Sequence, residues 1–201
     1  ENTPEGWQDM VADFVDASSA TRLGIPLLYG VDANHGNGNV PGATLFPHFI
    51  GIGAANDPDL AERIGVAAAK ESRAMGIRWH YSPTFDLPKD IRWGRVYETF
   101  SDDPRRAGAL GSAYIRGLQF TSEDNNHLNV LATAKHFAGL GSMTWGTSTN
   151  DDYRIDQGTI PRNESVLRNS LLPPYQAAID AGAMSIMAGL ALWGDEAITG
   201  S

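Results

Sequence analysis

The sequence predicts an α/β fold and, within that class, part of a parallel β/α barrel. Apolar runs that suit buried strands alternate along the chain with segments of helical periodicity. Strands separated by helices pair in parallel through right-handed crossovers. About four such units can be recognised, whereas a closed barrel needs eight and typically about 250 residues. We therefore expect residues 1–201 to form the N-terminal portion, about the first half, of a (β/α)8 TIM-type barrel.

The first expected elements are a helix and a strand. Apolar side chains recur at helical spacing over residues 7–20, and the pattern ends near Thr21. Residues 25–31 are then almost continuously apolar, which is typical of a strand buried on both faces in a parallel sheet. This strand runs directly into Asp32, so we expect Asp32 to lie at its carboxyl end.

Two later helices have clear start signals. Asp57-Pro58 opens one that is expected to end near Met75, and the acidic residues before Pro104 open another that reaches about Leu118. The other expected elements are a strand at 77–85, a strand at 130–134, helical segments within 164–181 and a strand at 184–190.

Composition excludes several functions. The chain has 15 Lys and Arg against 24 Asp and Glu, a formal charge of −9, which opposes nucleic-acid binding. The absence of cysteine excludes disulfides, thiolate metal sites and cysteine nucleophiles. No stretch approaches the roughly 18 apolar residues of a membrane span. We expect no nucleic-acid or membrane partner.

Metals and cofactors are not expected either. The residues His35, His48, His80 and His136 lack metal-ligand spacing. The glycines near Gly36 match neither the dinucleotide-binding fingerprint nor a phosphate-binding loop. The sequence contains no Gly-x-Ser-x-Gly motif, which argues against a serine hydrolase.

Polar residues follow the ends of the expected strands, which in a β/α barrel is where the chemistry takes place. Asp32 and His35 lie among glycines that allow a ligand to approach the backbone. A carboxylate there can accept two hydrogen bonds from sugar hydroxyls. A turn in which Asp32 caps the next segment is an equally good interpretation.

The segment around Trp93 carries two arginines three positions apart. Arg92 and Arg95 on either side of an indole suit a pocket for a polyhydroxylated ring. The structural alternative, which we favour from these residues alone, pairs Arg92 with Asp90 or Glu98 and places Trp93 in the core.

Lys135 and His136 follow an apolar strand directly, where burial is costly without partners. A sugar hydroxyl or a carboxylate would satisfy them; equally, the lysine could extend to water and the histidine could bond to the backbone. The polar loop at 142–156 contains Trp145, Asp151, Asp152 and Asp156 and could line a subsite, but solvated surface is the favoured interpretation.

Taken in order, these motifs resemble the opening barrel motifs of family 3 glycoside hydrolases, which include β-glucosidases and glucan exo-hydrolases. The stretch at 92–104, Arg-Trp-Gly-Arg-Val-Tyr-Glu-Thr-Phe-Ser-Asp-Asp-Pro, is the most specific one. The other matching stretches are 24–36, 42–48, 54–76, 117–119, 134–137 and 172–175.

The resemblance implies an exo-acting hydrolase that removes terminal β-linked glucose with retention from glucosides or β-glucan oligosaccharides. Asp32 would bind the distal hydroxyls of the glucosyl unit, and Arg95, Lys135 and His136 would also hold this unit. Arg92 would lie behind these residues, without contacting the sugar directly. The aspartate nucleophile is expected beyond Ser201, on a later strand in the remainder of the barrel, and the acid/base residue is often supplied by a following domain in this family. Such chemistry uses two carboxyl groups about 5 Å apart.

The sequence departs from the family pattern at three places. Ile91 stands where proline is usual, Leu140 stands where an acid is common, and residues 188–194 are more apolar than the usual Ser/Tyr-rich stretch. Two alternatives remain open: a non-catalytic sugar-binding fragment, and a related hydrolase acting on xylosides or N-acetylglucosaminides. A periplasmic or secreted location is expected, with the cytoplasm also possible.

Overall fold

The computed structural model describes residues 2–120 and 130–200. Its helices are α1 (Pro4–Ser19), α2 (Phe49–Ala55), α3 (Pro58–Ala74), α4 (Pro104–Gln119), α5 (Glu164–Val166) and α6 (Pro173–Asp180). Its strands are β1 (Gly30–Val31), β2 (Trp79–His80), β3 (Leu131–Phe137), β4 (Thr159–Ile160), β5 (Ser185–Ala188), β6 (Leu192–Trp193) and β7 (Glu196–Ala197). A π-helix at Leu167–Leu171 joins α5 to α6, and short 3-10 turns lie at Val96–Glu98, Leu140–Ser142 and Ile198–Gly200.

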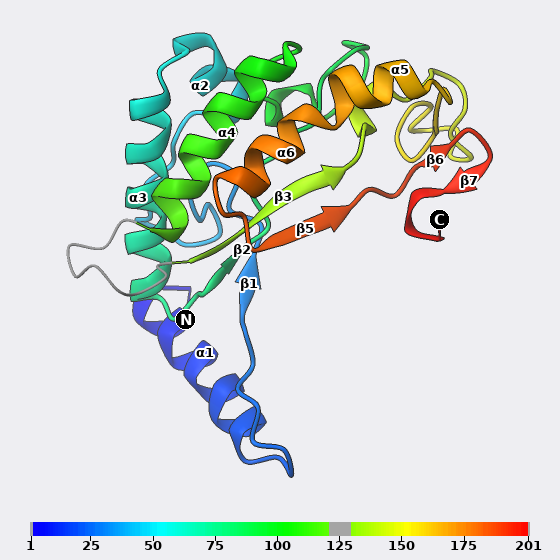
Figure 1. The fold of residues 1–201 in the computed structure, drawn as a ribbon. Helices are drawn as coiled ribbons and strands as arrows, with labels where there is room; N and C mark the ends of the chain where they lie inside the picture. Colours follow the sequence, from blue (N-terminus) through cyan, green and yellow to red (C-terminus); the bar gives the residue numbers. More distant parts are fainter. Residues whose placement is uncertain (1, 121–129, 201) are drawn as a thin grey trace.

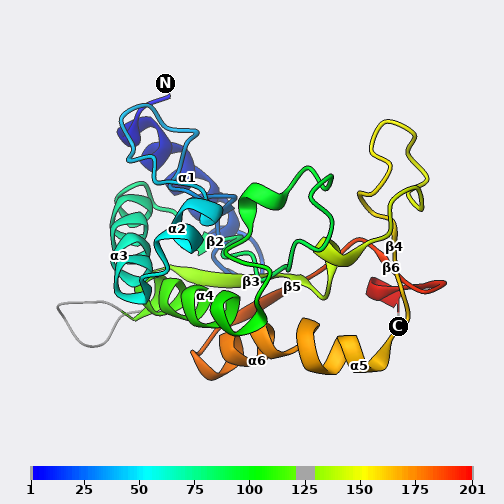
Figure 2. The ribbon, with the colours of Figure 1, turned by 90° about the horizontal axis from the view of Figure 1, so that it is seen from above.

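Four parallel strands form the main sheet in the order β1-β2-β3-β5. Neighbouring strands are also successive in the alternation of strand and helix, as they are in a β/α barrel. Helices α3, α4 and α6 lie side by side on one face of the sheet (Figures 1 and 2). The predicted α/β class and the strand order of a partial barrel are therefore confirmed.

Helices α3 and α4 begin where the sequence predicts. The Asp57 side chain accepts a hydrogen bond from the Leu60 amide at 3.1 Å, and Asp103 caps α4 by accepting from two backbone amides. The two helices then pack closely at a glycine: a Cβ on Gly117 would lie 2.1 Å from the Glu62 carbonyl oxygen. The absence of a side chain at Gly117 therefore allows the close approach of α4 to α3.

The main core lies between this helical layer and the sheet. It consists of buried side chains from α2, α3, α4, α6, β3 and the segments that connect such elements, including Phe49, Ile64, Phe85, Tyr114, Leu118, Ala132 and Tyr175. A second cluster lies beneath the loops that follow β3 and includes Leu87, Trp93, Leu140, Ile155 and Ile160.

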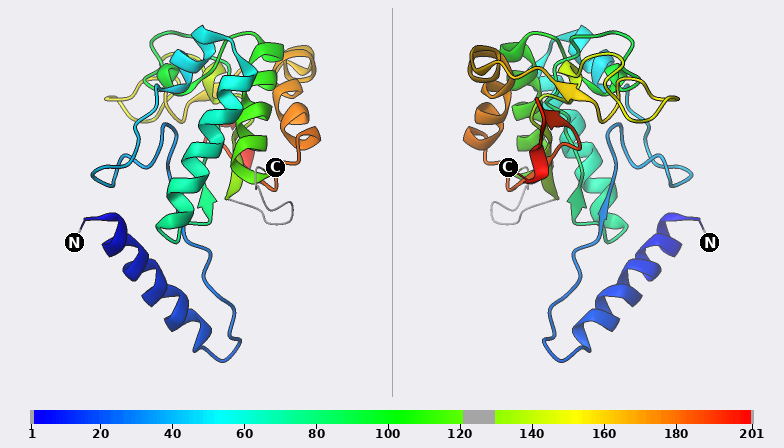
Figure 3. Two further views of the ribbon diagram at one scale, coloured as in Figure 1. Left: turned by 90° about the vertical axis from the view of Figure 1, so that its left-hand side faces the viewer. Right: turned by 90° about the vertical axis from the view of Figure 1, so that its right-hand side faces the viewer.

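The prediction of a fully buried strand at 25–31 is wrong. Only Gly30–Val31 pairs as β1, and Leu27 is 46% exposed. Because β1 is at the edge of the described sheet, the preceding segment has no neighbouring strand on one side. Helix α1 leaves the body at an angle, and only its Val11 is buried (Figures 1 and 3). Within residues 2–120 and 130–200, little covers this apolar segment.

Other elements are shorter than expected or were not predicted. The strand expected at 77–85 is reduced to β2 with a single bridge from Thr84 to Lys135, and Pro83 lacks an N–H for strand pairing. Helix α2 and the small sheet β4-β6-β7 were not expected. Among the described helices, none is both long enough and apolar enough to span a membrane.

Candidate functional site

The carboxyl end of the sheet brings Asp32 and Lys135 together. Asp32 follows β1, Lys135 lies in β3, and the Lys135 Nζ atom donates a hydrogen bond to Asp32 Oδ1 at 2.5 Å. The lysine side chain is only 1% exposed, whereas that of Asp32 is 61% exposed. A buried ammonium group is stable only with a partner, and the Asp32 carboxylate provides one.

Asp32 keeps much of its hydrogen-bonding capacity free. Its Oδ1 atom accepts from Lys135 and, at 3.3 Å, from the Asn34 side-chain amide. No described residue donates to Oδ2. An ionised carboxylate offers about four lone-pair positions, so Asp32 can accept further hydrogen bonds from a ligand.

Arg95 is held by Glu98 in a two-pronged ion pair. Its Nε and Nη2 atoms donate to the two carboxylate oxygens, each at 2.7 Å, and Glu98 is buried. Burial lowers the pKa of Arg95, but the hydrogen bonds and charge of Glu98 outweigh it, so the pKa lies above its usual value. The Asn34 amide also lies 3.4 Å from Glu98 Oε2 and thereby links this pair to Asp32.

His136 is fixed by Asp86, which lies in the segment after β2. The Asp86 carboxylate lies 2.8 Å from the His136 ring Nδ1 and accepts the backbone amides of His136 and Leu140 at 3.1 and 3.0 Å. Because a carboxylate only accepts hydrogen bonds, Nδ1 acts as the donor and Nε2 remains for another partner.

A buried histidine lies in the strand next to the one that precedes Asp32. His80 in β2 aligns with Val31 of β1, and its Nε2 atom lies 2.7 Å from the Ser72 hydroxyl. Burial lowers the pKa of His80 to about 4, although the nearby charge of Asp32 raises it in part. The imidazole is therefore neutral at ordinary pH and adds no positive charge near Asp32.

The structural interpretation of Arg92 is supported by its contacts. Its guanidinium group pairs with Asp90 at 2.5 Å, and these hydrogen bonds lower the Asp90 pKa to about 2. Trp93 is buried in the second core cluster. Arg92 also lies over the indole of Trp145, with its guanidinium carbon 4.3 Å from the ring centroid.

The 142–156 loop is largely exposed, as the favoured interpretation expects, but three of its residues also face a hollow on that surface. Trp145, Asp152 and Asp156 line a cavity of about 380 Å³ together with Arg92 and Arg95. The cavity lies where the loop after β3 meets the loop that carries the two arginines, and both loops lie on the same side of the sheet in Figure 2. Sequence spacing contained no sign of this contact, because it joins segments about fifty residues apart.

The departure at Leu140 has a packing explanation. Leu140 is buried in the second core cluster, and a Cβ on Gly189 would lie 2.0 Å from Leu140 Cδ1. The glycine therefore provides the space that the leucine occupies. Among the described residues, no group of three or more His, Asp or Glu side chains is placed to hold a metal ion.

A parallel sheet whose strands alternate with helices, with charged residues gathered at the carboxyl ends of the strands, is the arrangement of a β/α-barrel domain; barrel enzymes have their active sites at this end. The chain belongs to the glycoside hydrolase family 3, since residues 2–201 match the family described as "Glycosyl hydrolase family 3 N terminal domain".

Known members of the family are similar in sequence and structure. A β-xylosidase from Formosa agariphila is 37% identical over 87% of this chain and 24% of its own length. The exo-1,3/1,4-β-glucanase from a Pseudoalteromonas species has a TM-score of 0.87 and 38% identity, covering 98% of this chain and 31% of its own. A β-glucosidase from Listeria innocua in complex with glucose has a TM-score of 0.79 and 30% identity, covering 92% of this chain and 24% of its own. The chain thus spans about a quarter to a third of these proteins.

Proposed function

We propose that residues 1–201 are the N-terminal portion of the barrel of a retaining, exo-acting β-glucosidase, and that this portion supplies the glucose-binding subsite. One observation carries the proposal. Asp32, Lys135 and Arg95, from three separate segments, belong to one hydrogen-bonded network through Asn34 and Glu98. Convergent charged groups at the carboxyl ends of barrel strands are typical of a substrate site.

The charged groups of this network, and His136 outside it, each have a specific task toward a sugar. Asp32 accepts hydrogen bonds from two hydroxyl groups of the terminal ring, while Lys135 holds its carboxylate in place. Arg95, oriented by Glu98, donates to the same ring, and the free Nε2 of His136 forms a further hydrogen bond with it. Contacts that strengthen as the ring flattens toward an oxocarbenium-like state lower the barrier, whereas contacts of constant strength do not.

The bond-breaking carboxylates are expected outside this chain. In the proposed enzyme, the nucleophile lies on a later barrel strand and the acid/base residue lies in the remaining polypeptide. Residues 1–201 therefore act by binding and orientation. Substrates are proposed to be β-glucosides or β-glucan oligosaccharides, which the names of the two structural relatives support. The name of the Formosa agariphila relative favours testing xylosides as the second candidate.

The principal test replaces Asp32 in the whole enzyme. Two charge-assisted hydrogen bonds of roughly 1.5–3 kcal/mol each correspond to a loss of about 10²–10⁴-fold in kcat/KM. We expect this loss for Asp32→Ala on aryl β-glucosides. Asp32→Asn, which keeps an oxygen that can accept from Lys135, should retain more of the fold's stability but little of the activity.

Asp59→Ala, an exposed position in the first turn of α3, is the matched control and should leave kcat/KM unchanged. Near-normal kinetics of Asp32→Ala would overturn the assignment. Comparing aryl glucoside, xyloside and N-acetylglucosaminide determines the sugar. Titration of the 201-residue chain with glucose tests the alternative of a binding fragment, which predicts saturable binding without hydrolysis.

A further inference from the structure

Asp86 is a buried acidic residue to which the proposed function gives no task. Its side chain is 0% exposed, and it lies in the segment that follows β2. Each of its carboxylate oxygens accepts a backbone amide, one from His136 and one from Leu140. The oxygen that accepts the His136 amide also meets the ring of the same residue at 2.8 Å. The carboxylate therefore fixes both the backbone and the imidazole of His136.

Asp86 also connects the two chain segments that carry His136 and Arg95. Three positions after Asp86, the Lys89 amide donates a hydrogen bond to the Gly141 carbonyl oxygen at 2.8 Å. The segment that starts at Asp86 therefore lies against the loop after β3 before it continues to Arg95. One buried carboxylate thus holds His136 in place relative to the segment that leads to Arg95.

The ring of His136 has one nitrogen left for a ligand. The side chain is 8% exposed, and its Nε2 atom has no hydrogen-bond partner among the residues that the structure describes. Nε2 is not one of the described polar atoms that are both fully buried and unpaired, so it reaches the surface of the site. Because Asp86 keeps the ring proton on Nδ1, the neutral imidazole presents a lone pair at Nε2.

A hydrogen-bond acceptor at this place complements the cations of the site. Lys135 and Arg95 can only donate, and a sugar hydroxyl that accepts from either of them still has its own proton to donate. The lone pair on His136 Nε2 can accept that hydrogen bond. If the ring proton were on Nε2 instead, Asp32 would be the only acceptor among the four groups proposed to hold the sugar.

We propose that Asp86 is a positioning residue of the glucose subsite, which holds His136 in the Nδ1–H tautomer so that Nε2 accepts a hydrogen bond from a glucose hydroxyl. The inference rests on the proposed function, because it requires a glucose ring in contact with His136. Asp86 is fully covered and does not touch the sugar. Its effect on hydrolysis therefore passes through His136, whereas a purely structural carboxylate would act only through the stability of the fold.

The kinetic test is a double-mutant cycle in the whole enzyme on aryl β-glucosides. Asp86→Asn keeps the size of the side chain but loses its charge and one acceptor oxygen. We expect kcat/KM to fall by roughly 10–100-fold, the usual effect of removing the partner that orients a functional histidine. The double variant should be no more than about threefold below His136→Ala alone, because the two residues act as one unit. If the two losses multiply, the proposal is wrong.

A spectroscopic test does not depend on activity. Nitrogen-15 NMR of the 201-residue protein distinguishes protonated from bare ring nitrogens, and His136→Ala assigns the signals of this ring. At mildly alkaline pH we expect a protonated Nδ1 and a bare Nε2 for His136. A proton on Nε2 in the unchanged protein would overturn the proposal, and this result can be obtained even if Asp86→Asn does not fold.

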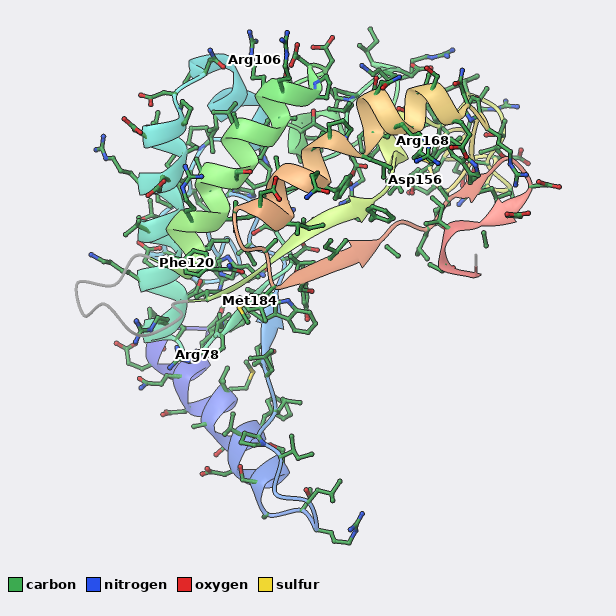
Figure 4. The ribbon with its side chains drawn as sticks, in the orientation of Figure 1. Arg78, Arg106, Phe120, Asp156, Arg168 and Met184 are labelled. Atoms are coloured by element: carbon green, nitrogen blue, oxygen red, sulfur yellow. The ribbon has the colours of Figure 1, made fainter. Side chains whose placement is uncertain are left out.

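Asp180→Asn is the matched control for the loss of a carboxylate. Asp180 is an exposed residue at the end of α6 that accepts a hydrogen bond from Gln176 at 2.9 Å. It comes shortly before Met184, which Figure 4 places at the amino end of β5, away from Asp156 in the loop after β3. Its kcat/KM should equal that of the unchanged enzyme.

The outcomes separate this inference from the proposed function. Multiplied losses in an otherwise active β-glucosidase would remove the role of Asp86 and leave the glucose subsite intact. Failure of the unchanged enzyme to hydrolyse any aryl β-glucoside would instead overturn the proposed function, and the positioning role with it.

Discussion

Two apolar segments of this chain both predict strands but have very different surroundings. Residues 131–137 form β3, which lies between β2 and β5 and beneath α4 and α6, and most of its side chains are buried. Residues 25–31 are at least as apolar, yet only the last two form a strand, at the edge of the sheet. The helix before them, α1, stands away from the body (Figure 3).

The difference shows that an apolar run predicts a tendency to be buried but does not supply the partner that buries it. In β3 the partners are two strands and two helices from other parts of the chain. At 25–31 the neighbouring strand on one side is missing from the described residues. In the proposed enzyme, the rest of the barrel would provide that neighbour.

A matched pair of leucine substitutions tests this comparison and should give the largest effect. Leu118 in α4 is 0% exposed, so Leu118→Ala leaves a cavity and should lower the free energy of unfolding of the 201-residue protein by about 2–5 kcal/mol. Leu27→Ala should change it by no more than about 0.5 kcal/mol, because Leu27 is 46% exposed. Urea unfolding followed by circular dichroism measures both. Equal losses would show that residues 25–31 are buried after all.

A second prediction concerns His80, the buried histidine of β2. Its pKa is about 4 in the folded protein and 6.5 in the unfolded chain, so between these values the unfolded state binds more protons. Stability from this group is complete above pH 6.5 and falls as the pH drops toward 4, by about 3 kcal/mol in total.

The test measures the free energy of unfolding of the unchanged protein and of His80→Gln in urea at several pH values. The carboxylates titrate in both proteins, so their contribution cancels in the difference. The difference should depend on pH only between about 4 and 6.5. If this difference in the free energy of unfolding stays constant across the range, His80 has the same pKa in the folded and the unfolded protein, and the prediction is wrong.

The smallest effect tests the contact between α3 and α4. Gly117→Ala places a methyl group 2.1 Å from the Glu62 carbonyl oxygen, so the helices must separate. We expect a loss of about 1–3 kcal/mol, despite the higher helix propensity of alanine. Gly94→Ala is the control, because a Cβ there meets no atom within 4 Å. If Gly117→Ala leaves the Tm unchanged in thermal unfolding, the interface between α3 and α4 can accept a methyl group, and close packing at Gly117 is not required.

Much of the fold follows from local sequence signals. The Asp-Pro starts of α3 and α4 were correctly predicted, because a capping side chain and a proline act within one turn. Helix α2 was missed: it has seven residues, two of them glycine, and no side-chain cap. Strands β4, β6 and β7 have two residues each, which is too short to show an alternating pattern.

The sequence predicted some residues of the candidate site but not the contacts that join them. Asp32 and Lys135 were singled out because polar residues at the ends of apolar strands need partners, whereas Arg95 was assigned through the family resemblance. The structure joins the three in one network. The role of Asn34 as the link was not predicted. That the loop around Trp145 lines a cavity was the less favoured of two interpretations, since a polar loop of this composition is usually solvated surface.

The sequence by itself determined the class of fold, the start of the main helices and the polar residues that must lie at strand ends, because these depend on interactions between residues close in the chain. Only the tertiary structure decided which apolar run is buried, which carboxylate each cation meets, and where the two loops enclose a cavity. Those outcomes depend on the distance between segments far apart in sequence, and packing of the helices against the sheet sets that distance.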